Sequence, residues 1–222
     1  MRPLVIYGAG GFAREVLELI RDINREQESW SVLGFLSDDR DSWGSIINDL
    51  PILGGEPWLD SQADGVSVVF GIGSPAAKLQ ITQRLRSRKL QWPSLIHPNV
   101  VISQRVAVGT GVVITAGNIL TTEITLGDFS MVNLACTIGH DCMIGRYTTI
   151  SPGVNVSGYV HLGDGCDVGT GSAFVQGVAV GEWSIIGAGA VVAKTVPANC
   201  TAVGVPARVI KERQPGWQAA NA

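Results

Sequence analysis

Residues 132–155 read VNLACT-IGHDCM-IGRYTT-ISPGVN, four consecutive blocks of six that each begin with an aliphatic residue. This spacing holds without a change of phase over Ile102–Val192, where all sixteen such positions are aliphatic or Phe. A period of six fits neither the 3.6-residue helix nor the alternation of an ordinary strand. The stretch is typical of a hexapeptide repeat that folds as a parallel β-helix, because each short strand needs neighbouring coils to bury its apolar residue.

The composition is that of a folded protein with a sizeable core, since 45% of the 222 residues are apolar and 16% are charged. A formal charge of -3 provides no electrostatic footprint for nucleic acid. No run of about eighteen apolar residues is present, so we expect no membrane span. The chain begins Met1-Arg2-Pro3 without the features of a secretory signal. The four cysteines form no Cys-x-x-Cys pair, which favours reduced thiols and a cytoplasmic enzyme.

Before the repeat, strand and helix patterns alternate. Residues 4–7 read as a buried strand, and an amphipathic helix follows over residues 12–23. Further strands are predicted at residues 32–36 and 66–70, and a helix that starts at Ser74-Pro75 is predicted to run to about Leu90. Alternation of this kind implies a small parallel sheet. We therefore expect a Rossmann-like α/β unit over residues 1–92, a β-helix over 93–211, and a polar tail over 212–222 that is mobile or packed on a neighbour.

The first predicted strand is followed by Gly8-Ala9-Gly10-Gly11-Phe12-Ala13, which fits the pattern G-x-G-x-x-A. Such a turn presents backbone N–H groups at a helix N-terminus, where the helix dipole favours an anion such as pyrophosphate. Asp38 and Asp39, at the end of the second strand, stand roughly where an acidic residue binds ribose. Because the unit is only half of a dinucleotide domain, the pattern indicates one nucleoside diphosphate or, alternatively, only a tight turn.

Three features of the chain together point to a known family: the N-terminal glycine motif, the sequence Ile138-Gly139-His140-Asp141-Cys142, and the end of the repeat at Gly204-Val205-Pro206-Ala207-Arg208. With them, the chain resembles the bacterial hexapeptide-repeat acetyltransferases that act on nucleotide-linked amino sugars or on sialic acid. The resemblance implies a left-handed β-helix of about three hexads per coil. It also implies a homotrimer with acetyl-CoA bound between neighbouring helices.

The resemblance also assigns catalytic roles. His140 matches the general base of the family and Asp141 the acidic residue that orients it, while Asn133 matches an asparagine near the reaction centre. Gly158 matches a glycine whose N–H can hold the thioester oxygen. The chemistry suits this assignment, because an imidazole titrates close to neutral pH and can accept the proton of an attacking amine. His140 is also out of phase with the inward-pointing residues, so a corner histidine in solvent is the alternative.

Binding residues carry over less directly. For acetyl-CoA, the resemblance indicates contacts at Thr149, Thr170 and Ala188, and Lys194 and Arg208 stand near the coenzyme end, where a basic side chain suits a phosphate. The positions that match contacts to the nucleotide sugar are Gly10, Gly11, Phe12, Asp38 and Gly73. Some relatives carry His at the position of Phe12, and two acidic residues in the place of Ser37-Asp38.

Two other chemistries can be weighed against acetyl transfer. A zinc site of the γ-carbonic anhydrase type needs three histidines in register, but His97, His140 and His161 are separated by 43 and 21 residues and occupy different phases of the hexad. We therefore expect no metal. Cys142 beside His140 resembles a Cys–His nucleophile, yet it shares the phase of Cys136 and Cys166 and is predicted to pack inward.

The sequence thus predicts an acetyl-CoA-dependent N-acetyltransferase that acts on a nucleotide-linked amino-deoxy sugar by direct transfer. One alternative is an O-acetyltransferase of sialic acid or a related sugar with the same machinery. A second is a trimeric nucleotide-binding scaffold without catalytic activity. The repeat itself does not distinguish an amine acceptor from a hydroxyl acceptor.

Overall fold

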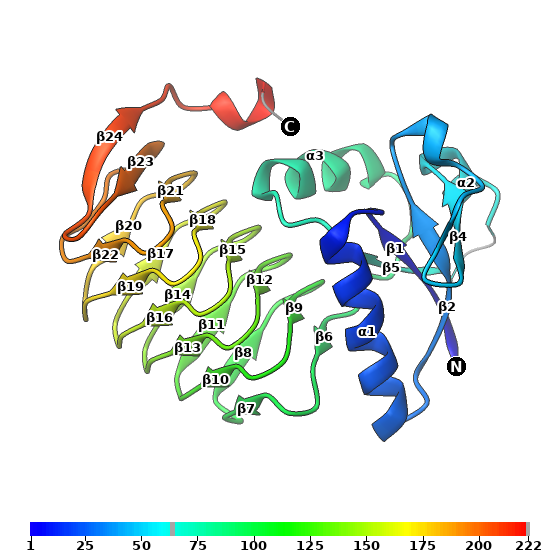
Figure 1. Cartoon of the computed structure of the whole chain (residues 1–222), viewed down its shortest axis with the longest axis horizontal. Helices are drawn as coiled ribbons and strands as arrows, with labels where there is room; N and C mark the ends of the chain where they lie inside the picture. Colours follow the sequence, from blue (N-terminus) through cyan, green and yellow to red (C-terminus); the bar gives the residue numbers. More distant parts are fainter. Residues whose placement is uncertain (63–64, 221–222) are drawn as a thin grey trace.

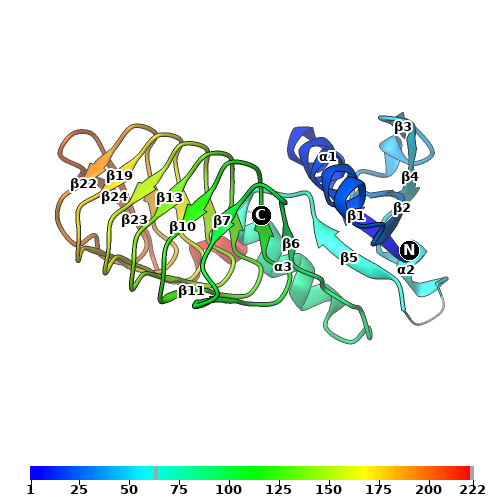
Figure 2. The ribbon, with the colours of Figure 1, turned by 90° about the horizontal axis from the view of Figure 1, so that it is seen from below.

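A computed structural model of the chain describes residues 1–62 and 65–220. An α/β unit stands at one end of a long β-helix, and the C-terminal segment returns along the β-helix towards it (Figure 1). Viewed from below, the coils form one column, with α1 lying beyond its first coils (Figure 2). The predicted fold class, a Rossmann-like unit followed by a left-handed parallel β-helix, is confirmed.

The N-terminal unit is a five-stranded sheet covered on both faces by helices. The sheet order is β3-β4-β2-β1-β5, and all neighbours are parallel except β3 and β4. Its elements are β1 (Arg2–Tyr7), α1 (Gly11–Glu26), β2 (Trp30–Leu36), η1 (Arg40–Ser42), β3 (Ile46–Ile47), β4 (Leu50–Gly54), α2 (Glu56–Asp60), β5 (Ser67–Phe70) and α3 (Pro75–Leu85).

The alternation of β1 explains the two layers of helices. Leu4 and Ile6 point to one face, where they pack with α1, and Val5 and Tyr7 point to the other, where they pack with α2 and α3. The helix α3 ends at Leu85 and not near Leu90 as predicted. The chain after it must run beside β5, because the Val68 N–H donates to the Gln91 carbonyl. A helix cannot continue into that extended pairing.

The β-helix consists of three sheets of short strands, which are parallel throughout except where β24 pairs antiparallel with β23. Sheet I contains β7 (Val101–Ile102), β10 (Ile119–Leu120), β13 (Thr137–Ile138), β16 (Asn155–Val156), β19 (Ala173–Phe174) and β22 (Val191–Val192). Sheet II contains β8 (Val106–Val108), β11 (Ile124–Leu126), β14 (Met143–Ile144), β17 (His161–Leu162) and β20 (Ala179–Val180). Sheet III contains β6 (Leu95–Ile96), β9 (Val113–Ile114), β12 (Met131–Val132), β15 (Thr149–Ile150), β18 (Asp167–Val168), β21 (Ile185–Ile186), β23 (Cys200–Val203) and β24 (Arg208–Glu212).

The hexad period becomes a stacking register of eighteen residues, three hexads per coil. In sheet I, Leu120 pairs with Ile138, which pairs with Val156, and the three side chains are buried in one column of the core. The corners between sheets repeat with the same period. At the corner from sheet I to sheet II, Asp141 and Tyr159 both adopt a left-handed backbone, with φ of 59° in each. The period of six therefore fixes both the core and the corners.

The α/β unit and the first coils share one core. Leu19 of α1 packs in a cluster with Leu95, Val113 and Met131 of sheet III. On the other face, the rings of Trp92 and Phe129 meet edge to face with centroids 5.3 Å apart. Burial of aromatic rings at the junction fixes how the two units lie relative to each other.

The C-terminal segment packs on its own chain. After β24 it crosses to α3, where η2 (Trp217–Ala220) lies alongside the helix, and the Gln80 side chain donates to the Ala219 carbonyl at 3.1 Å. The Arg213 guanidinium lies 4.4 Å from the centre of the Trp217 ring. Across residues 1–62 and 65–220, no helix has both the length and the hydropathy needed to cross a membrane.

Candidate active site

The His140–Asp141 pair lies at the corner between β13 of sheet I and β14 of sheet II. His140 Nδ1 is 2.8 Å from Asp141 Oδ2, and about half of each side chain is exposed. Because a carboxylate only accepts hydrogen bonds, the Nδ1 atom donates to it, and the lone pair of the imidazole then resides on Nε2. The pair therefore presents a base whose tautomer is set by its neighbour.

Gly158 lies directly beneath the imidazole ring, one coil further along the β-helix. A methyl group at Gly158 would come within 2.6 Å of His140 Nε2 and Cε1. The ring also meets Tyr159 edge to face, with centroids 5.0 Å apart. Within the described part of the chain, the Gly158 N–H donates to no acceptor. The absence of a side chain at Gly158 thus leaves the space that the His140 ring occupies. The role of the Gly158 N–H in holding the thioester oxygen stays a prediction.

Three other residues of the expected site occupy a different corner, between sheet III and sheet I. Asn133 follows β12, Thr170 follows β18, and Ala188 follows β21. Thr170 and Ala188 are exposed, and Asn133 Oδ1 accepts from the Leu134 N–H at 2.7 Å. The strand β13 separates Asn133 from His140, so the two residues lie at opposite ends of one side of the coil. One chain does not bring the two corners together.

The remaining predicted coenzyme residues lie at other places. Lys194 follows β22 and is exposed, and Arg208 begins β24 near the last coil. Thr149 is buried in sheet III, where its hydroxyl donates to the Gly73 carbonyl at 2.5 Å and accepts from Lys78 Nζ at 3.0 Å. Contacts of Thr149 and Thr170 with acetyl-CoA stay predictions, but the hydroxyl of Thr149 is already engaged between the two units.

The predicted nucleotide residues gather at the carboxyl ends of β1, β2 and β5. The strand order changes direction at β1, which is where open α/β sheets bind ligands. Gly10 and Gly11 are exposed at the start of the sixteen-residue helix α1, and Gly10 provides no side-chain cap for its first N–H groups. Gly8 abuts the loop after β5, since a methyl group there would lie 2.7 Å from the Gly71 carbonyl oxygen. The exposed N–H groups at this helix start are suited to an anion. We refer to the surface at the carboxyl ends of these strands, bounded by the glycine turn and the loop after β5, as the crevice.

Two of the predicted nucleotide residues flank this crevice. Phe12 is half-buried against the α1 core cluster, so its ring contributes to packing as well as lining the turn. Gly73 follows β5, and its carbonyl is the acceptor for Thr149. The roles of both in binding a nucleotide sugar stay predictions.

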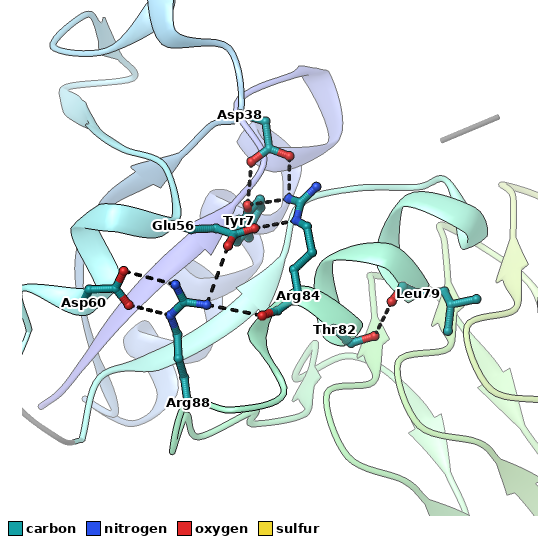
Figure 3. A network of polar contacts seen from close by, with 8 residues as sticks. All are labelled: Tyr7, Asp38, Glu56, Asp60, Leu79, Thr82, Arg84 and Arg88. Atoms are coloured by element: carbon teal, nitrogen blue, oxygen red, sulfur yellow. Dashed lines mark hydrogen bonds and ion pairs between the residues drawn. The ribbon is translucent and has the colours of Figure 1, made fainter. Parts of the chain in front are cut away.

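Asp38 is held by residues that the sequence alone did not single out (Figure 3). Tyr7 donates to Asp38 Oδ1 at 2.6 Å, and Arg84 Nη2 donates to Oδ2 at 2.7 Å. Burial, together with the Asp38 carboxylate, raises the pKa of Tyr7, so its hydroxyl stays protonated and donates. Both carboxylate oxygens are thereby oriented, two residues after the end of β2.

The same network extends along α3 (Figure 3). Arg84 also pairs with Glu56, and Arg88 donates to both Asp60 carboxylate oxygens at 2.7 and 3.1 Å. These ion pairs line a cavity of about 430 Å³ that also contains the ring of Trp43. Arg84 of α3 and Arg88, three residues after its end, therefore hold Asp38 and the acidic residues of α2 in place.

The residues of the two alternative chemistries are not arranged for a Cys–His nucleophile or for a zinc site within the described part of the chain. Cys142 is fully buried, as its phase predicts, and burial raises the pKa of its thiol, which disfavours a thiolate nucleophile. His97 Nε2 lies 3.1 Å from Asp22 Oδ2 at the junction with α1, and His161 is exposed in β17. Over residues 1–62 and 65–220, no three His, Cys, Asp or Glu side chains gather as a metal site.

A left-handed hexapeptide β-helix, a His–Asp pair at a corner, and an anion-binding glycine turn define a hexapeptide-repeat acyltransferase with an added nucleotide-binding unit. Comparison with known proteins agrees with this class. Residues 3–85 match the family model described as the PglD N-terminal domain. The chain is 30% identical over 213 residues to the GDP-perosamine N-acetyltransferase of Escherichia coli O157:H7, covering 93% of this chain and 95% of the relative.

Solved structures agree over nearly the whole chain. The acetyltransferase domain of PglB from Neisseria gonorrhoeae FA1090 is 30% identical, with a TM-score of 0.86 and coverage of 95% of this chain and 100% of that domain. Perosamine N-acetyltransferase from Caulobacter crescentus, in complex with CoA and GDP-perosamine, is 28% identical, with a TM-score of 0.86 and coverage of 95% and 97%.

The chain therefore belongs to the PglD-type family of hexapeptide-repeat sugar N-acetyltransferases. The predicted activity, acetyl-CoA-dependent N-acetylation of a sugar, is confirmed at this level. A scaffold without catalytic activity is not supported.

The contact between Gly158 and the His140 ring leads to a testable prediction. In the variant Gly158→Ala the backbone N–H is kept, but the new methyl group occupies the place of the imidazole. The ring must therefore swing away, and a displacement of about 1 Å should lower kcat by roughly a hundredfold. Because a flexible side chain yields and the backbone does not, the melting temperature should change little. Ser157→Ala, one residue earlier on the exposed side, serves as the control; equal kcat in both variants would contradict the role of Gly158.

Proposed function

We propose that the enzyme transfers the acetyl group of acetyl-CoA to the amino group of a nucleotide-linked amino-deoxy sugar, with His140 as general base. The observation that carries the proposal is the 2.8 Å His140–Asp141 contact at an exposed corner, in a chain that also has an anion-binding crevice. The relative from Escherichia coli is named for GDP-perosamine, and the enzyme from Caulobacter crescentus binds that compound. These substrates support a nucleotide-linked amine as the acceptor here.

The residues suggest a direct transfer in one ternary complex. The neutral amine of the sugar attacks the thioester carbonyl carbon, forming the C–N bond, while Nε2 of His140 takes a proton from that nitrogen. The oxygen of the tetrahedral intermediate carries the negative charge, which the free N–H of Gly158 would stabilise. The C–S bond then breaks, and the imidazolium returns its proton to the CoA thiolate. Asp141 stabilises the imidazolium and keeps the ring in place.

The nucleotide portion is assigned to the crevice of the α/β unit. The uncapped N–H groups at Gly11 and Phe12 would receive the pyrophosphate, and Gly73 would line the opposite wall. Asp38, already oriented by Tyr7 and Arg84, would accept a hydrogen bond from ribose or base. Acetyl-CoA would lie along the corner of Thr170 and Ala188, with Lys194 or Arg208 near its phosphates.

A homotrimer would complete the site, because the corner of Asn133, Thr170 and Ala188 lies away from the corner of His140. In a symmetric trimer the first corner of one chain faces the second corner of the next. Exposed apolar side chains lie on sheet I and its two corners, as expected of an interface: Ile119 is 44%, Leu134 41% and Tyr159 57% exposed. Each active site would then be built from two chains.

The role of His140 is tested by comparing two exposed histidines. His140→Ala should lower kcat by roughly 10² to 10⁴, because proton removal from the amine loses its acceptor. His161→Ala, in β17 on the adjacent sheet, should retain the wild-type rate. Steady-state turnover with acetyl-CoA and GDP-perosamine, or another nucleotide-linked amino sugar that the enzyme accepts, provides the measurement. A kcat of His140→Ala near the wild-type value would contradict the assignment of His140 as general base.

The nucleotide crevice is tested at Gly11, where a new side chain meets only Arg14 Nη2 at 3.8 Å. Gly11→Asp places a carboxylate where the pyrophosphate would bind, so the affinity for GDP and UDP should fall about a hundredfold or more. Gly11→Ala should bind as the wild type does. Thermal stabilisation by each nucleoside diphosphate, with guanosine and uridine as phosphate-free controls, reports the affinity. Equal stabilisation of both variants would contradict binding at this turn.

The shared active site is tested by co-expression of two inactive variants. His140→Ala retains the corner of Asn133, and Asn133→Ala retains the corner of His140. If each site uses one corner from each of two chains, random mixing in a trimer should restore about a quarter of the wild-type rate. Each variant expressed alone should stay inactive. Absence of any recovery in mixed trimers, confirmed by differential tags, would contradict a site made by two chains.

A further inference from the structure

Lys78 is buried on α3, and the proposed reaction gives it no role. Its side chain is only 1% exposed, and lysine is among the residues that are almost never fully buried without partners. Nζ donates to the Phe129 carbonyl at 2.9 Å and to Thr149 Oγ1 at 3.0 Å, both on the β-helix. The amine therefore joins a helix of the α/β unit to the first coils through specific hydrogen bonds, where an apolar side chain would have packed at lower cost.

Thr149 passes this contact on to the crevice. Its hydroxyl accepts from Lys78, so its own hydrogen is available, and it donates to the Gly73 carbonyl at 2.5 Å. Because a carbonyl oxygen only accepts, the single hydroxyl hydrogen of Thr149 goes to Gly73, and its lone pairs are left to accept from Lys78. The result is a chain of hydrogen bonds that starts at Lys78 and ends at the backbone of Gly73.

Gly73 belongs to the loop of residues 71–74, which forms one wall of the crevice. The loop is in close contact with the glycine turn and with α1. A methyl group at Gly8 would lie 2.7 Å from the Gly71 carbonyl oxygen, and one at Gly71 would lie 2.6 Å from Ala13 Cα. The glycine turn and α1 leave the loop no free space on their side. Any movement of the loop would therefore change the shape of the crevice.

We propose that Lys78 is a positioning residue: through Thr149 it fixes the loop 71–74 against the β-helix and so sets the crevice for the nucleoside diphosphate of the substrate. The inference rests on the proposed function, in which this crevice binds the nucleotide sugar. It assigns to one buried side chain the link between the unit that selects the substrate and the unit that acetylates it.

The protonation state of Lys78 does not decide the contact. Burial lowers the pKa of its amine to about 7, while Asp167, which pairs with Thr149 in sheet III and whose own pKa is raised by burial, acts in the opposite direction. A neutral amine has two hydrogens and an ammonium has three. Either form supplies the two donors that Phe129 and Thr149 use, so the link to Gly73 persists on both sides of neutral pH.

The proposal is tested by removing the amine while keeping the length of the side chain. In Lys78→Met, Thr149 loses its donor and Gly73 is held less firmly. The dissociation constant for GDP, UDP or dTDP, whichever the wild type binds most tightly, should rise about tenfold, as for the loss of one buried hydrogen-bonded link. The dissociation constant for CoA should stay within about twofold of the wild-type value. Both dissociation constants are measured by isothermal titration calorimetry. The exposed Lys89→Met is the matched control and should leave both constants unchanged.

A purely structural lysine would behave differently. It would lower the melting temperature of Lys78→Met but leave the ratio of the two dissociation constants at its wild-type value, and that result would overturn the proposal. Thr149→Val removes the hydroxyl and keeps the shape, so it should weaken nucleotide binding by a similar factor. It carries the test if Lys78→Met does not fold, and it is judged by nucleotide binding alone because Thr149 is also a predicted acetyl-CoA contact. Thr137→Val, exposed on sheet I, is its control.

Different results would overturn the proposed function and the positioning role of Lys78. A wild-type protein that binds none of GDP, UDP and dTDP would overturn the binding of a nucleoside diphosphate in the proposed function and this inference with it. A wild type that binds one of them, with Lys78→Met and Thr149→Val binding it equally well, would overturn the positioning role only. The double variant provides a further check, because Lys78 and Thr149 belong to one chain of hydrogen bonds. Lys78→Met combined with Thr149→Val should bind the nucleotide no more weakly than the weaker-binding of the two single variants.

Discussion

The stacking of equivalent residues eighteen positions apart is the constraint on which the rest of the structure depends. Successive coils are so close at the corners that many glycines have no room for a side chain: a methyl group at Gly145 would lie 2.4 Å from the Asp164 nitrogen. Each coil must therefore repeat the backbone of the coil before it. The left-handed backbone of Asp141 is one instance of that repetition, shared with Tyr159 one coil later. The geometry proposed for catalysis follows from the same constraint, because this corner puts the Asp141 carboxylate beside His140.

Periodicity made the β-helix predictable, since the first position of every hexad over Ile102–Val192 is apolar and the phase never changes. It also placed His140 outside the core and Cys142 inside it, and the structure agrees on both. Contacts between distant parts of the chain could not be predicted in this way. Tyr7 and Arg84 are 77 residues apart, and Lys78 and Thr149 are 71 apart. No local pattern reports such pairs. A weaker signal was present for Lys78, which precedes the buried Ile81 and Leu85 of α3 by three and seven residues and so lies on the core face of the helix.

Two expectations differed from the structure for physical reasons. The helix α3 is shorter than its sequence suggests, because the chain at Gln91 pairs with β5. The C-terminal tail, whose polar residues suggested mobility, packs on α3 through Gln80, and Arg213 lies over the Trp217 ring within the tail itself. In both places a tertiary partner outweighs local propensity, which is weak at the ends of elements.

The arrangement separates substrate choice from chemistry. The crevice consists of loops at the carboxyl ends of strands, where a change of side chain alters the ligand contacts without altering the sheet. The His140 corner has no such freedom, since Gly158 below it and Tyr159 beside it belong to the repeating coils. A family built in this way can accept different nucleotide sugars on one acetyl-transfer frame, provided that the loops keep their position relative to the β-helix. The core that Leu19 shares with Val113 and Met131 holds the α/β unit as a whole against the β-helix. Apolar packing is non-directional, so it does not by itself fix the orientation of the loop that borders the crevice. The hydrogen bond from Thr149 to the Gly73 carbonyl is directional and joins that loop to the β-helix.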